Sequence, residues 1–468
     1  MRLLALTLAL AAAAAHADTL SLNDYLDQVR QGNPQLKQLR AQDTAYALAA
    51  KQPLTAYSPM LNGQIETLND QTVPVLAAFS PAQTNSDSWN LGLSKFFSTG
   101  TNVNLAYEGD VTKLTFPPNG FVGDLPATTG HQWDVTITQS LWRNFNAAEV
   151  KASIAQASAG SEAARAANRY AAQALLFQAR TAYVQLETAR QVRSLQEESL
   201  TRNAKILDWT QQKEADNLAD KVDVLQVQAS MRLVSLGLSS SLQAEAEGSA
   251  LFNRLRGISP SAQVEDLEPL SAPAALPAPK GDRADIEAAR QALKGSDAQV
   301  DSIKQSFTPD VSVFATLGMN DRDSDAATAF SGSWNGSHPQ SIIGLKVSAN
   351  LDRGLMLDVL AGAKQASGAG QAQVDDKEAS LASDWQQLKQ QWQGTQDRLA
   401  LAQALETLQG EKAEREKSRY RDGRTTDFQV LRFEDDYSLS RVQILQLLAG
   451  ARAIEAQAKF YNGDDQPW

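Results

Sequence analysis

The chain has 468 residues, a formal net charge of -11, three histidines and no cysteine. Without cysteine, disulfide frameworks, thiolate zinc sites, cysteine nucleophiles and a lipidated N-terminal cysteine are excluded. The acidic balance and the lack of a basic run argue against nucleic acid as a partner. The sequence contains no phosphate-binding loop, zinc-protease motif or serine-hydrolase motif, so we expect no catalytic residue, metal, cofactor or enzyme activity.

The first 17 residues have the pattern of a signal peptide. Arg2 gives the start a positive charge, residues 3–15 are Leu, Ala and Thr, and Ala15-His16-Ala17 is a small-x-small cleavage pattern. The apolar run is shorter than the roughly 20 residues that a membrane-spanning helix needs. We therefore expect an exported protein whose mature chain begins at Asp18.

After this segment, residues 19–57 have the pattern of a helix. Ser21 is a suitable N-cap, and Gly32-Asn33-Pro34 interrupts the pattern at a point where proline suits a first helical position. We expect the helix to stop near Pro59, where the character of the sequence changes.

Residues 59–142 alternate apolar and small polar side chains, which is the period of half-buried β-strands. The turn at 98–101 is tight, whereas the connections at 69–88 and 110–131 are long and polar. Short turns at one end of a sheet and long loops at the other are typical of outer-membrane β-barrels. A soluble β-sandwich would alternate in the same way, so the strands alone leave both folds open. The clearest alternating segments are 89–94, 102–107 and 133–141.

The longest helical pattern runs from about Ala147 to Glu214, without proline and rich in Ala, Gln, Arg, Glu and Leu. A helix of that length would be on the order of 100 Å long. Its sparse apolar residues fall near heptad spacing, which suits packing against neighbouring helices, and a two-stranded coiled coil fits the same spacing. A shorter helix is expected over about 223–255, with Gly257 at its C-terminal end.

The second half of the chain repeats this order of helix, strands, long helix, tight turn and shorter helix. At one constant offset, Asn217 falls on Gly423 and Gly257 falls on Gly463. Asn and Gly tolerate a left-handed backbone best, so we expect a sharp turn after each long helix. The predicted domains are a signal peptide (1–17), a first structural repeat (18–257, strands about 59–142, helices about 147–256), a Pro/Ala-rich linker (258–281), a second structural repeat (282–463, strands about 309–351, helices about 355–462) and a tail (464–468).

This order of elements has a geometric consequence. The opening and closing helices of each half, stacked end to end, would match the length of the unbroken long helix. The strands of one chain are too few to close a barrel, and open strand edges are not tolerated in lipid, so several chains must share one sheet. Helices that continue from such a barrel would form a tube across much of the periplasm, which predicts a conduit.

The chain resembles the TolC family of outer-membrane efflux proteins over essentially its whole mature length. The resemblance rests on the duplicated order of elements and on short motifs, which are densest around the second turn. Those motifs are Gly32-Asn33-Pro34, Gln139-Ser140-Leu141-Trp142 with its counterpart Ser348-Ala349-Asn350-Leu351, residues 216–225 and residues 420–431.

The resemblance implies a mixed fold of α-helices and membrane β-strands, in which a homotrimer shares one transmembrane β-barrel continued by a long periplasmic α-helical barrel. It implies an exit duct in the bacterial outer membrane, for a tripartite multidrug efflux system or a type I secretion system. The implied partners are outer-membrane lipid, a periplasmic adaptor and an inner-membrane pump of the ABC, RND or MFS type. A soluble periplasmic adaptor is the alternative, because adaptors also combine helical hairpins with β-structure.

The strand count departs from the family pattern. A family member with two strands in each half has four strands per chain, whereas residues 59–142 carry four predicted strands here and residues 309–351 two. Three chains of six strands would close an 18-stranded barrel, wider than the 12-stranded alternative. The additional hairpin, 89–109, could instead fold outside the membrane.

The resemblance also assigns functional residues. In relatives with an acidic gate, aspartates lie one and two turns into the last helix, where this chain has Gln429 and Arg432. Asp427 or Glu434 could substitute, but we expect either to lie on a solvated helix face. The candidate gate residues are Asp223, Asp427, Gln429 and Arg432. The family's adaptor contacts at the periplasmic tip correspond to Asp216, Asn217, Leu218, Asp422, Gly423 and Arg424.

Overall fold

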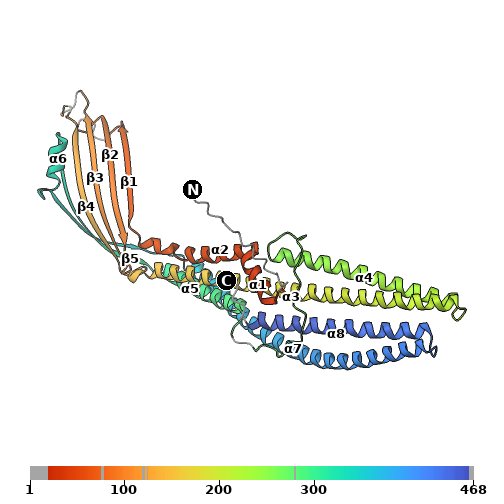
Figure 1. Cartoon of the computed structure of the whole chain (residues 1–468). Helices are drawn as coiled ribbons and strands as arrows, with labels where there is room; N and C mark the ends of the chain where they lie inside the picture. The colour runs from red at the N-terminus through yellow and green to blue at the C-terminus, as the bar shows by residue number, and fades with distance from the viewer. Residues whose placement is uncertain (1–18, 75–78, 119–121, 124, 279–280, 463–467) are drawn as a thin grey trace, which may run out of the picture. The chain divides into compact units, whose positions relative to one another are not determined.

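The computed structural model describes residues 19–74, 79–118, 122–123, 125–278, 281–462 and 468, so the predicted signal peptide and Gly463 lie outside the described residues. Among the helices of the described residues, none combines the length and the hydrophobicity of a membrane span. The helices (Figure 1) are α1 (Leu22–Gly32), α2 (Pro34–Ala49), α3 (Ala148–Ala215), α4 (Lys221–Leu255), α5 (Ala284–Ser306), α6 (Ala326–Gly332), α7 (Arg353–Arg421) and α8 (Asp427–Asn462), with two 3-10 helices, η1 (Gln52–Tyr57) and η2 (Phe145–Ala147). The strands are β1 (Met60–Asp70), β2 (Gln83–Phe96), β3 (Thr101–Thr115), β4 (Thr128–Ser140), β5 (Asp310–Asp323) and β6 (Pro339–Ser348).

The two long predicted helices are confirmed, with 68 residues in α3 and 69 in α7. Both lack proline and consist largely of strong helix formers, so nothing in the sequence interrupts them. The turns that follow are left-handed as predicted, with φ of 57° at Asn217 and 70° at Gly423. Gly257 after α4 also has a positive φ, 75°.

The opening helix is divided at the predicted motif. The side-chain oxygen of Asn33 accepts hydrogen bonds from two backbone N–H groups at the start of α2, at 2.8 and 3.1 Å, and its amide donates to the Leu255 carbonyl at 2.6 Å. A Cβ at Gly32 would overlap the carbonyl oxygen of Arg256, so only glycine allows these helix ends to approach. The expected stop near residue 59 comes earlier, because the ring of Pro53 does not fit a continuing α-helix and α2 gives way to η1.

The six strands form one antiparallel sheet in the order β1-β2-β3-β4-β5-β6. The predicted count of four strands before residue 142 and two after residue 309 is therefore confirmed. The additional hairpin, 89–109, belongs to this sheet as part of β2 and β3. Within the described chain β1 and β6 each pair on one side only, so the sheet of a single chain is open.

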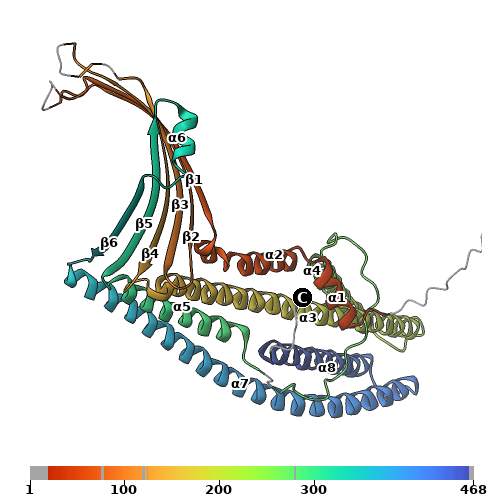
Figure 2. The ribbon, with the colours of Figure 1, turned by 90° about the vertical axis from the view of Figure 1, so that its left-hand side faces the viewer.

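The sequence did not predict α6, a short helix in the connection between β5 and β6. Asp325 caps it by accepting a hydrogen bond from the backbone N–H of Thr328 at 2.9 Å. The helix lies against β4 and β5 on one face of the sheet (Figure 2).

The chain divides into two compact units, and each contains parts of both sequence repeats. The sheet unit contains residues 45–164 and 289–374, and the helical unit contains the rest of the described chain. The largest core of the helical unit surrounds Tyr25, whose ring stacks on Phe252 with 3.9 Å between centroids. Burial raises the pKa of the neighbouring Tyr183 to about 12.

Candidate functional site

One face of the sheet is apolar and exposed. Because successive side chains of a strand point to opposite faces, the odd-numbered residues of every strand share this face. The strand register forms a continuous apolar row across five strands, each member of which is between 41% and 70% exposed. Soluble monomers rarely expose a contiguous apolar surface of this kind. The row consists of Leu61, Leu93, Leu105, Val135 and Leu317.

Aromatic side chains lie near both ends of the strands. At the end nearer the long connections, Tyr107 and Trp133 pack with ring centroids 4.4 Å apart, and Trp89 lies in the next row. Beside the tight turn at the other end, the exposed aromatic residues are Phe97, Trp142 and Phe145. Two aromatic borders around an apolar band are typical of outer-membrane strands.

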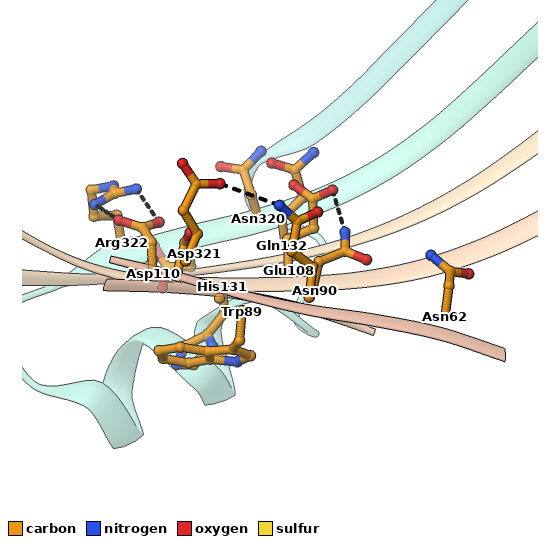
Figure 3. Close-up of a pocket in the computed structure, with 15 residues that line it drawn as sticks. Asn62, Trp89, Asn90, Glu108, Asp110, His131, Gln132, Asn320, Asp321 and Arg322 are labelled. Atoms are coloured by element: carbon orange, nitrogen blue, oxygen red, sulfur yellow. Dashed lines mark hydrogen bonds and ion pairs between the residues drawn. The ribbon is translucent and has the colours of Figure 1, made fainter. Parts of the chain in front are cut away.

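The opposite face of the sheet is polar (Figure 3). The Asn90 amide donates to the Glu108 carboxylate at 2.7 Å, and an open polar pocket of about 540 Å³ lies along this face. In Figure 3, Asn62 and Gln132 lie on the same side as this pair, whereas His131 lies on the other side with a helix. The sheet therefore separates an apolar surface from a polar one.

An ion pair crosses a whole strand on the polar face. Arg322 of β5 donates to the Asp110 carboxylate of β3 at 2.6 Å, although β4 lies between them. A Cβ at Gly130 of β4 would approach both groups to 2.5 Å, so the glycine makes room for the pair.

The predicted tip residues form two matching turns in the helical unit. After α3, the Leu218 N–H donates to the Lys213 carbonyl at 2.7 Å, and after α7 the Arg424 N–H donates to the Arg419 carbonyl at 2.8 Å. Each of these is the longer, six-residue hydrogen bond of a Schellman motif. The left-handed residue of the motif is Asn217 in the first turn and Gly423 in the second. All six predicted contact residues are exposed: Asp216, Asn217, Leu218, Asp422, Gly423 and Arg424.

The four candidate gate residues have different environments. Asp223 is exposed and completes a capping box with Asp220 at the start of α4. Gln429 is exposed and accepts a hydrogen bond from the Thr425 hydroxyl at 3.0 Å, and Arg432 is also exposed. The expectation of a solvated position for Asp427 and Glu434 is wrong. Both carboxylates are buried, because each is paired with a side chain of a neighbouring helix.

Three side-chain contacts join α3 to α8, and we call them the α3–α8 seam. On α8 the contacting positions are spaced by seven residues, which keeps one helix face toward a neighbour. The Arg202 guanidinium lies 2.8 Å from the Glu434 carboxylate, and the Arg441 guanidinium donates to Glu198 at 2.6 Å. The third contact is a hydrogen bond from the Thr210 hydroxyl to the Asp427 carboxylate.

Glu434 extends the seam to a third helix. Its side chain is 2% exposed, and its second carboxylate oxygen lies 2.6 Å from the Lys417 ammonium of α7. Burial by itself would lower the pKa of Lys417, but the nearby Glu414 and Glu434 carboxylates outweigh it and raise that pKa. One buried carboxylate therefore holds two cations from two different helices.

An apolar cluster lies next to the seam. Tyr420 of α7 is buried in it, and the Lys213 ammonium of α3 lies 3.4 Å from the centre of the ring. Burial and the nearby Asp427 carboxylate raise the pKa of Tyr420. The cluster unites α3, α4, α7 and α8 through Ile206, Val227, Tyr420, Val430 and Leu431. Close to their turns, the two helical hairpins of one chain are therefore packed against each other.

Sequence reasoning missed the α3 side of the seam. Glu198, Arg202 and Thr210 are ordinary polar residues on a long helix, and nothing in their spacing marks a partner. The available signal was on α8, where the charged residues Asp427, Glu434 and Arg441 recur at heptad spacing.

Comparisons with known proteins bear on the fold. No protein-family model matches the sequence, and no curated protein matches it. The structure matches the outer-membrane channel OprN at a TM-score of 0.72 and 19% identity, over 94% of this chain and 90% of that chain. It matches the outer membrane protein VceC from Vibrio cholerae at 0.70 and 16% identity, over 94% and 96% of the two chains.

A third solved structure is the open state of the MtrE outer membrane channel from Neisseria gonorrhoeae. It matches at a TM-score of 0.67 and 15% identity, over 94% of this chain and 88% of that chain. At these identities the likeness establishes a shared fold across almost the whole chain.

Proposed function

Because the chain has the fold of outer-membrane channels, we propose that this protein is the outer-membrane exit duct of a tripartite efflux system. The proposal rests above all on the sheet. Its apolar face is exposed between two aromatic borders, and its opposite face is polar. In a soluble adaptor such an apolar face would be exposed to water, whereas the wall of a membrane channel contacts lipid on one side and water on the other.

The open edges of the sheet support a closed assembly of three chains. Unpaired backbone groups are not tolerated in hydrocarbon, so β1 and β6 must find partners. Since neighbouring strands alternate in direction, β1 and β6 run antiparallel to each other, and β6 of one copy can pair with β1 of the next. Three chains of six strands each would close an 18-stranded barrel with the polar face inside.

Exposed apolar side chains on the outer helices support the same assembly. In the helical unit α8 contacts both α3 and α4, while apolar side chains remain exposed on α4 and α7. Leu233 and Leu236 of α4 and Leu401 and Leu408 of α7 are all strongly exposed. We assign these surfaces to contacts between copies in a homotrimer.

The two left-handed turns are the proposed site of adaptor docking. They are exposed and carry opposite net charge, since Asp216 and Asp220 outnumber Lys221 at one turn, whereas Arg421 and Arg424 outnumber Asp422 at the other. Docking by charged partners would weaken as salt screens these groups. In this scheme the adaptor links the turns to an inner-membrane pump.

We assign the α3–α8 seam to control of passage. The seam ties one helical hairpin to the other close to the turns, so its release would allow the hairpins to separate. Adaptor binding would open the duct by favouring the separated arrangement. Asp427 belongs to the seam, whereas Asp223, Gln429 and Arg432 remain candidates for lining the opening.

Electron microscopy of the detergent-extracted protein tests the proposal. We expect a threefold tube that is longer than 100 Å, on the order of the length of the long helices. A compact monomer, or a protein released into a soluble periplasmic extract without detergent, would favour the adaptor alternative and contradict the duct.

A further inference from the structure

The connection between β5 and β6 folds back onto the apolar face of the sheet. The Phe330 ring of α6 stands edge-on to His131, with 5.4 Å between centroids, and the Trp334 ring lies 4.2 Å from that of Trp133. Ala329 of this helix is fully buried. In Figures 1 and 2 the helix lies beside the strands, and its contacts are with β4 and β5. This segment is therefore packed on the sheet and is not a free loop.

The helix covers the polar side chains of an otherwise apolar region. His131 and Asp321 are register partners on β4 and β5, at odd positions that share the apolar face. His131 is buried, and its Nδ1 is hydrogen-bonded to the Tyr107 hydroxyl at 2.8 Å. A Cβ at Gly332 would overlap the Asp321 carboxylate, so a larger residue at this position would require that carboxylate or the helix to move. Without α6, both polar groups would face lipid, which is unfavourable.

The position of His131 and Asp321 along the strands matches the expected border of the apolar layer of a membrane. From Val311 to Asp321, β5 advances about 33 Å along the strand. With the usual strand tilt of about 40°, this distance corresponds to about 25 Å of membrane, the apolar height of outer-membrane barrels. One row further, the same face carries four polar residues, Thr67, Asp87, Thr129 and Asp323, together with the apolar Val111.

We infer that α6 is an interfacial helix, which lies at the outer border of the membrane, and that Phe330 of this helix and Trp334 of the turn after it face lipid. These two rings are 44% and 52% exposed, and they continue the apolar surface of the strands over the polar pair. Aromatic side chains favour the boundary between hydrocarbon and water. The inference rests on the proposed function, because it requires the apolar face of the sheet to lie in a membrane.

Spin labelling tests this inference directly, because the chain has no native cysteine. Phe330→Cys, Leu317→Cys and Glu108→Cys would each carry a nitroxide, in the full chain reconstituted into phosphatidylethanolamine/phosphatidylglycerol vesicles. Accessibility to oxygen reports lipid, and accessibility to a water-soluble nickel chelate reports water. We expect an oxygen-to-nickel ratio that is highest at 317, lowest at 108 and intermediate at 330.

The outcomes separate this inference from the proposed function. If position 317 reports lipid but position 330 reports water, α6 is not interfacial although the channel is. If position 330 is protected from both reagents, a protein covers the helix, and the inference is also overturned. If position 317 itself reports water, the membrane assignment of the sheet fails.

A second variant tests how the helix is held. Gly332→Val places a branched side chain against Asp321 and should lift α6, which would raise nickel accessibility at the label on residue 330. Ala327→Val adds the same side chain at an exposed position of the same helix and should leave the label unchanged. An unchanged label in Gly332→Val would contradict the close packing that the inference requires.

Discussion

Glu434 is the residue on which the α3–α8 seam depends most, because its carboxylate holds both Arg202 of α3 and Lys417 of α7. Replacement by glutamine keeps the volume of the side chain and removes its charge. We expect the two helical hairpins to separate more readily near their turns, and the duct to spend more time open.

The contact with Arg202 sets the size of this effect, because Lys417 and Glu434 belong to the same helical hairpin. Removing one member of a fully buried ion pair costs about 3–5 kcal/mol. Arg202 and Lys417 keep 22% and 19% of their side-chain surface exposed, so both can turn toward water. The loss should therefore be nearer to about 2 kcal/mol, a typical value for a charge-assisted hydrogen bond. Such a loss shifts the equilibrium between joined and separated hairpins roughly 30-fold.

Pulsed electron paramagnetic resonance would measure this separation between two nitroxide labels, one on Lys205→Cys of α3 and one on Phe428→Cys of α8, both at exposed positions. Glu434→Gln should broaden and lengthen the distance distribution and raise the open probability in planar lipid bilayers. Glu411→Gln is the matched control, since Glu411 is 61% exposed and pairs only with an exposed arginine among the ion pairs of the described chain. If both variants keep the parent's distances and conductance, the seam does not hold the hairpins together.

Three further predictions follow from single residues. Gly423→Val forces a branched residue into a left-handed backbone, at a cost of about 1–2 kcal/mol. The variant should abolish efflux in the native host, while gel electrophoresis still shows an assembled trimer. Retained efflux would count against the turn assignment. Gly130→Ala should break the ion pair that crosses β4 and lower the free energy of unfolding of the assembly by about 1 kcal/mol or less, because the arginine is half exposed; a thermal melt should show this as a lower melting temperature. Gly63→Ala, which meets only ordinary contacts, should leave the melting temperature unchanged. A hydrogen bond from Arg441 lowers the pKa of Glu198, so the stabilising effect of this contact is present at neutral pH and is lost as the pH falls through that lowered pKa. The protection of the α3 amides against hydrogen exchange, corrected for the intrinsic pH dependence of the exchange rate, should therefore fall on acidification, and Glu198→Gln should remove that response.

Much of the fold could be predicted because its signals are local. Helix formers without proline specify α3 and α7, and residues tolerant of a left-handed backbone end them at Asn217 and Gly423. Alternation with period two predicted the strands and their number, since the side chains of a half-buried strand must alternate. The exposed turn residues were also predicted, but only through their resemblance to a known tip.

The tertiary structure alone decided which side chains meet. Arg202 and Glu434 lie far apart in the sequence, and their contact depends on how two long helices are rotated against each other. For the same reason Glu434 was expected in solvent, although the fold buries it between two cations. Likewise α6 is too short for a periodic signal, and its place over His131 follows from the close approach that Gly332 permits. The sequence by itself therefore determined the elements and their order, because backbone preferences act over a few residues. The seam and the covered polar pair required the folded chain, because contacts between distant residues are fixed only by packing.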